Sequence, residues 1–147
     1  MQAGSQIVDI SRVIQLSIAP VFLLTGVASL LGVMSGRLGR TIDRARVVEA
    51  MLVSTTDQAK IDQLHGELEV ASRRAKIIYR GIAFGTTSAL LVCVVIVSLY
   101  VSALLEYPIS KIVGTLFILA MFALIAALVS FMREVFLATR ALRIGPR

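Results

Sequence analysis

The stretch VIQLSIAPVFLLTGVASLLGVMSG, residues 13–36, runs between Arg12 and Arg37 without a single charged side chain. Two further uncharged runs follow, at residues 81–105 and 112–132. At about 1.5 Å of rise per residue, a helix of any of these lengths spans the roughly 30 Å hydrocarbon core of a bilayer. Within hydrocarbon only a helix or a closed barrel satisfies its own backbone. The sequence therefore predicts an all-α membrane protein with three transmembrane helices.

The composition agrees with this prediction. Apolar residues make up 57% of the chain and charged residues 16%, against roughly 45–50% and 25% in soluble domains. The net charge of +6 comes from basic residues that flank the uncharged runs and are mixed with acids. Membrane topology alone produces this pattern, so we expect no nucleic-acid binding. The sequence has no catalytic motif and no metal-ligand spacing, so we expect neither an enzyme nor a cofactor.

The distribution of basic residues predicts the orientation. Residues 37–80 hold nine Lys and Arg side chains, whereas residues 106–111 hold one. Basic loops remain preferentially in the cytoplasm, so we expect the N-terminus outside and the C-terminus inside. The expected parts are the outer N-terminus with span one (1–36), a cytoplasmic segment (37–80), span two (81–105), an outer loop (106–111), span three (112–132) and a cytoplasmic basic tail (133–147).

The tail should contact the anionic lipids of the inner leaflet. Each basic residue near such a surface contributes about 1 kcal/mol. The four basic residues of the tail are Arg133, Arg140, Arg143 and Arg147.

The cytoplasmic segment is predicted to form a helical hairpin that resembles an antiparallel coiled coil. Its first arm should run to about residue 53 and its second arm should begin at about residue 57, because Thr55 and Gln58 have capping-box spacing. The second arm carries an unbroken stripe of apolar positions three and four residues apart. That stripe is Ile61, Leu64, Leu68, Ala71, Ala75 and Ile78, and the first arm offers Leu38, Ile42, Ala45, Val48 and Leu52.

An arginine motif directly follows span one. Helical spacing places Arg37, Arg40 and Arg44 on one face, and Asp43 lies three residues from both Arg40 and Arg46. One interpretation is a topology anchor at the lipid headgroups, with Asp43 offsetting its neighbours. The other is a ring of arginines around a cytoplasmic opening or a partner site.

Two elements carry a family resemblance: Ile18-Ala-Pro-Val-Phe-Leu-Leu24 in span one and Arg37-Leu-Gly-Arg-Thr-Ile-Asp-Arg-Ala-Arg46 after it. Together they resemble the small bacterial membrane proteins grouped as domain of unknown function 2721. The resemblance covers most of the chain in layout, and its specificity rests on residues 19–46. It implies a bacterial inner-membrane location and the predicted architecture, and it implies no activity.

Span one also has a face of small and polar residues. At 100° per residue these lie within about 60° of one direction, together with two larger apolar side chains. Such a face can pack closely on another helix, or it can line a narrow watery path between several copies. The candidate pore-lining residues are Ser11, Gln15, Ile18, Phe22, Thr25 and Ser29.

Self-association is expected because three spans alone bury little surface. A stripe on one span closes naturally into a ring, so we expect a homo-oligomer of three to six copies. The leading functional hypothesis is a passive ion or solute channel lined by span one. The alternative is a non-conducting membrane scaffold or regulator that binds a cytoplasmic protein through its hairpin.

Overall fold

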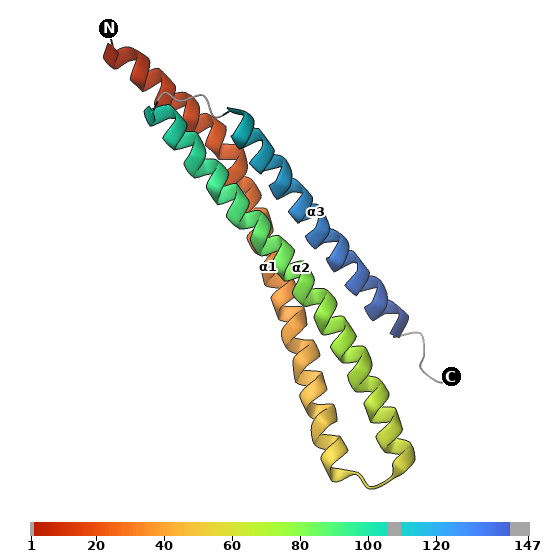
Figure 1. Ribbon diagram of the computed structural model, residues 1–147. Helices are drawn as coiled ribbons and strands as arrows, with labels where there is room; N and C mark the ends of the chain where they lie inside the picture. Colours follow the sequence, from red (N-terminus) through yellow and green to blue (C-terminus); the bar gives the residue numbers. More distant parts are fainter. Residues whose placement is uncertain (1, 106–109, 142–147) are drawn as a thin grey trace. The chain divides into compact units, whose positions relative to one another are not determined.

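The described part of the chain forms three long helices (Figure 1). The computed structural model describes residues 2–105 and 110–141, with side chains described at 11–12, 14–104 and 111–138. The helices are α1 (Gln2–Ser54), α2 (Gln58–Leu105) and α3 (Ser110–Ala141). Each uncharged run lies wholly inside one of them, and all three are long and apolar enough to cross a membrane. The prediction of an all-α chain with three such helices is confirmed.

The turn between α1 and α2 is short and well capped. α1 ends at Ser54, whose hydroxyl donates a hydrogen bond to the carbonyl of Met51 at 3.0 Å. The Asp57 carboxylate accepts one from the Ala59 N–H at 3.1 Å, and the Asp57 carbonyl accepts one from the Ile61 N–H at 3.0 Å. Asp57 is therefore the N-cap of α2, the position that the capping-box spacing assigns to Thr55.

The chain divides into two compact units. The first, which we call the apolar unit, contains residues 1–31 and 84–125. Its buried side chains are small or β-branched, and the Ser88 hydroxyl donates a buried hydrogen bond to the Ala120 carbonyl of α3 at 2.8 Å. Its buried residues include Ser17, Val27, Ser88, Val92, Val95 and Ala120.

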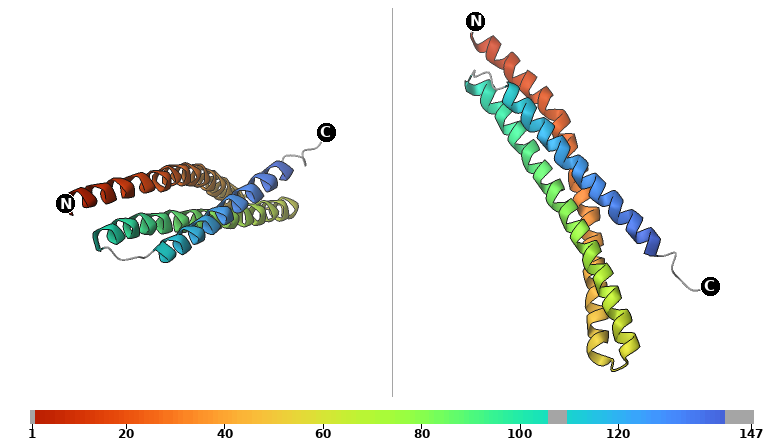
Figure 2. Two further views of the ribbon diagram at one scale, coloured as in Figure 1. Left: turned by 90° about the horizontal axis from the view of Figure 1, so that it is seen from above. Right: turned by 45° about the vertical axis from the view of Figure 1, so that its right-hand side comes forward.

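The second unit, which we call the hairpin unit, contains residues 32–83 and 126–147. Its parts of α1 and α2 are the two arms of a hairpin and lie side by side in both figures (Figures 1 and 2). Every residue of the predicted stripe on the second arm is buried or half-buried. The stripe therefore marks the inner face of that arm.

The first arm differs from its predicted stripe at one position. Ile42 is exposed, whereas Thr41 is half-buried in its place. The inner face follows residues 34, 38, 41, 45, 48 and 52, which alternate strictly between spacings of four and three. Position 42 breaks that alternation, so the helix turns its isoleucine outward in spite of its hydrophobicity.

Candidate functional site

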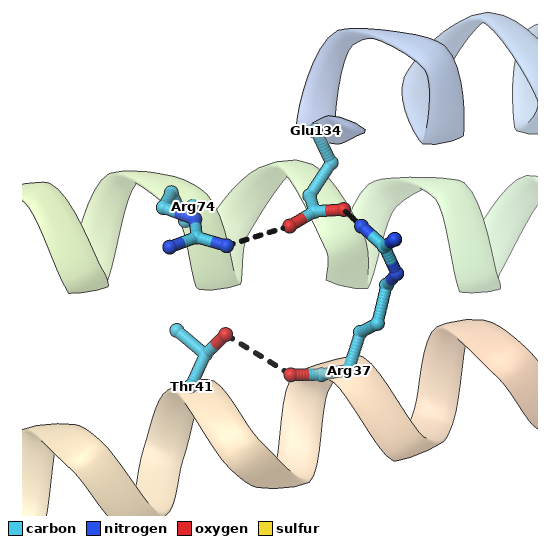
Figure 3. Close-up of polar contacts among 4 residues, drawn as sticks. All are labelled: Arg37, Thr41, Arg74 and Glu134. Atoms are coloured by element: carbon cyan, nitrogen blue, oxygen red, sulfur yellow. Dashed lines mark hydrogen bonds and ion pairs between the residues drawn. The ribbon is translucent and has the colours of Figure 1, made fainter. Parts of the chain in front are cut away.

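Three charged side chains from three helices meet in the hairpin unit (Figure 3). Glu134 of α3 is only 1% exposed, and its Oε1 accepts a hydrogen bond from Arg74 Nη2 of α2 at 2.9 Å. Its Oε2 accepts one from Arg37 Nη1 of α1. A buried carboxylate is costly unless it is paired and hydrogen-bonded, and here two guanidinium groups share that role. We call these three residues the ion cluster.

Local structure holds Arg37 in place. The chain leaves the uncharged run as unbroken helix, and the Thr41 hydroxyl donates to the Arg37 carbonyl at 3.0 Å (Figure 3). The guanidinium carbon of Arg37 lies 5.3 Å from the ring centroid of Phe131. Since Phe131 precedes Glu134 by three residues, the ring and the carboxylate share a helix face and contact the same cation.

A glycine allows three helices to approach closely near the ion cluster. Gly81 of α2 is buried, and a Cβ atom there would clash with the end of the Met34 side chain of α1. The same atom would lie 3.1 Å from the Cβ of Ser130 in α3. Small residues at such points are what lets helix backbones pack tightly in membrane proteins.

A pocket of about 1080 Å³ adjoins the ion cluster. Across it, Arg44 Nη2 of the first arm donates to Glu67 Oε2 of the second at 2.9 Å. Four arginines and two glutamates line the pocket, which leaves a formal net charge of +2. We call it the arginine pocket, and its lining is Arg37, Arg40, Thr41, Arg44, Gln63, Gly66, Glu67, Val70, Ala71, Arg74, Glu134 and Ala138.

The structure brings part of the predicted arginine motif together. Arg37, Arg40 and Arg44 all line the arginine pocket, as their shared helical face implies. Asp43 and Arg46 are exposed and do not line it. Among the described side chains Asp43 has no ion pair, so the suggested offsetting of its neighbours stays a prediction.

The candidate pore-lining face is exposed along its whole length. Ser11, Gln15, Ile18, Phe22, Thr25 and Ser29 are all exposed. The buried residues of this part of α1, Ser17, Pro20 and Val27, lie on the other side of the helix. The face therefore does not pack inside the chain.

Of the predicted basic tail, one side chain is described. Arg133 is exposed on α3, one residue before the ion cluster's carboxylate. Arg140 lies on α3 but outside the described side chains, and Arg143 and Arg147 lie outside the described residues.

Glu134 and Arg74 were not predicted as site residues from the sequence. A signal for Glu134 was present, because it is the sole acidic side chain between Lys111 and Arg147 and follows closely on a very apolar stretch of the same helix. A lone acid in such a helix needs a partner from another helix. Arg74 carried no comparable signal, since Arg73 and Lys76 beside it are equally basic and are exposed.

The chemistry available here is ionic recognition. In the described part of the chain no group of three His, Cys, Asp or Glu residues could hold a metal ion. The described arginines of the pocket supply fixed positive charge and planar N–H donors, which suit carboxylate and phosphate oxygens.

By length and composition the three helices are those of an α-helical multi-pass membrane protein. The chain belongs to the family described as Protein of unknown function (DUF2721), whose model matches residues 17–144. The suspected family membership is thus confirmed. No match was found to a curated protein or to a solved structure.

Proposed function

We propose that the protein is a homo-oligomer of the bacterial inner membrane whose α1 helices line a passive path for ions or small solutes. The observation that carries the proposal is the exposure of the whole candidate face of α1, from Ser11 to Ser29, which brings polar side chains to the surface of a predominantly apolar segment. A ring of three to six copies turns these faces toward a common axis.

The polar side chains on this face differ in whether they need a hydrogen-bond partner outside their own helix. The Thr25 hydroxyl donates to the Val21 carbonyl at 3.3 Å, and the Ser29 hydroxyl donates to the Thr25 carbonyl at 3.0 Å. These two hydroxyls have partners in their own helix. The Gln15 amide needs water or another copy, because lipid offers it no hydrogen bond. Gln15 therefore supports a wet or inter-helical surface more strongly than its neighbours do.

The same face also leaves room for a neighbour. A Cβ atom at Gly26 or Gly32 would meet nothing within 4 Å in the chain. Between these glycines and Gln15 lies Phe22, whose side chain is 74% exposed. In the proposed ring, Phe22 and Ile18 form the apolar constriction, with Ser11 and Gln15 at the outer mouth and the arginines at the inner end.

The orientation is part of the proposal. The nine basic residues of segment 37–80 support a cytoplasmic hairpin and an external N-terminus. The arginines of the tail then face the anionic inner leaflet.

Flux through the purified protein in liposomes tests the proposal. We expect wild-type protein to conduct under a voltage, tension or pH step, and Phe22→Ala to raise the flux several-fold. Leu16→Ala is the matched control, because Leu16 is also exposed on α1 but lies roughly 120° around the helix. An intact oligomer without flux rejects conduction, and a monomer in mild detergent rejects the ring itself.

A scaffold or regulator is the second candidate, and one observation favours it. The apolar side chains exposed on the hairpin include Ile42, Val47, Met51, Val53 and Val70. Exposed apolar surface on an arm outside the uncharged runs is typical of a protein contact. If liposomes show no flux, we expect site-specific photo-crosslinking from position 51 in cells to give one defined adduct, which Val47→Ser and Val53→Ser abolish.

A further inference from the structure

The arginine pocket holds more positive charge than its own carboxylates neutralise. Glu134 pairs with Arg37 and Arg74, and Glu67 pairs with Arg44. Arg40 lines the same pocket, is exposed, and has no ion pair with a described carboxylate. The unneutralised charge therefore centres on Arg40 and on the two arginines that share Glu134.

These guanidinium groups also retain hydrogen-bond capacity. Each arginine carries five N–H donors. Arg74 donates a hydrogen bond from Nη2 to Glu134, while its Nε is buried without a hydrogen-bond partner in the described part of the chain. Burial closes Nε to an incoming ligand, so Arg74 contacts one through its remaining Nη group, on a side chain that is 27% exposed.

We propose that the arginine pocket binds the phosphate group of an anionic ligand. Arg40 and Arg74 are the principal donors, since guanidinium forks match phosphate oxygens in geometry and charge. Glu134 holds Arg74 in place for this role through their 2.9 Å contact. All of these residues belong to the hairpin unit of one chain, so the site is complete without a second copy, and ligand binding can be measured without measuring conduction.

The size of the pocket restricts the ligand. Its volume of about 1080 Å³ is slightly above the roughly 300–1,000 Å³ typical of small-molecule sites. A bare phosphate ion fills little of that space, so the ligand carries a larger body. The apolar part of the lining, Val70, Ala71 and Ala138, suits such a body. The phosphate can belong to a soluble phosphorylated compound or to a phospholipid headgroup.

Two binding assays on the full-length protein separate these sources. In the first, equilibrium dialysis measures radiolabelled pyrophosphate and ADP on protein in phosphatidylcholine nanodiscs. In the second, the protein is placed in nanodiscs that contain phosphatidylcholine and phosphatidylglycerol. Native mass spectrometry then counts the phosphatidylglycerol molecules that remain bound after the protein is released from the nanodiscs. Each assay is run on wild type, Arg40→Gln and Arg73→Gln. Arg73 is the matched control, because it is exposed on the same unit, carries the same charge and does not line the pocket.

We expect at least one assay to show saturable binding of one ligand per chain. Arg40→Gln should weaken that binding about tenfold, as the loss of a charge-assisted contact implies, while Arg73→Gln should leave it within about twofold. Binding in the first assay identifies a soluble ligand, and binding in the second identifies a lipid. The proposal is overturned if neither assay saturates, or if both variants weaken binding equally. Unchanged unfolding of Arg40→Gln without ligand confirms that the variant is folded.

Discussion

The apolar unit and the hairpin unit contain parts of the same three helices but use different interactions to join them. In the apolar unit small and β-branched side chains pack, and a hydrogen bond from Ser88 to Ala120 joins two helices. In the hairpin unit a buried carboxylate binds arginines from two other helices. Both units bury apolar side chains, and the hairpin unit adds a buried ion cluster to that packing.

Physical chemistry explains the difference. Between apolar helices in lipid, association depends on close packing and on sparse hydrogen bonds, which average about 0.6 kcal/mol each. Where the helices become polar, a long side chain can carry charge into the interface, and its partner must then be present. The hairpin unit should therefore be sensitive to single charge changes, and the apolar unit should lose stability in small steps.

The largest effect is expected from Glu134→Gln. This change leaves Arg37 and Arg74 facing each other without a counterion, at side-chain exposures of 31% and 27%. We expect a loss of about 2–3 kcal/mol, below the roughly 3–5 kcal/mol for fully buried pairs because both arginines keep some solvent. The measurement is the free energy of unfolding by SDS titration in bicelles. Glu67→Gln is the control.

A smaller loss is expected from Gly81→Val. The added side chain must displace Met34 and crowd Ser130, and overpacking of this kind costs about 1–3 kcal/mol. The same unfolding assay measures it. Gly39→Val is the matched control, since a Cβ atom there meets nothing within 4 Å. Equal losses in the two variants would mean that the close approach of the helices at Gly81 does not set the effect.

Ser88→Ala should have a smaller effect still. It removes the buried hydrogen bond to the Ala120 carbonyl at 2.8 Å, and we expect a loss of about 0.6 kcal/mol and at most about 1.7 kcal/mol. Ser130→Ala is a useful comparison, because that hydroxyl donates to the Ala126 carbonyl of its own helix. A loss from Ser88→Ala as large as that from Glu134→Gln would remove the contrast between the two units.

The smallest effect is expected from Glu67→Gln. Its partner Arg44 is 63% exposed, Glu67 itself is 39% exposed, and such pairs contribute about 0–1 kcal/mol. The loss should shrink further as salt is raised, because ions screen exposed charges. A loss that matches Glu134→Gln and resists salt would show that the outer pair is as structural as the ion cluster.

Much of the fold was predictable because it depends on patterns local in sequence. Three uncharged runs specify three long helices, since an apolar run of that length must satisfy its own backbone. The stripe from Ile61 to Ile78 indicates the inner face of the second arm, because side chains at these spacings share a helix face. The first arm was harder to predict. Ile42 was assigned to the inner face because it is hydrophobic, but the strict alternation of four- and three-residue spacings places it on the outer face.

The candidate site was only half predictable. Spacing alone placed Arg37, Arg40 and Arg44 on one face, because they lie on one helix. Arg37 and Glu134 are 97 residues apart, and Arg74 and Glu134 are 60 apart. No local pattern selects Arg74 over its basic neighbours or pairs it with the single acid of α3. Tertiary packing decided these pairs. It buries Glu134 among three helices, and a carboxylate removed from water must pair with the cations that the packing brings within reach.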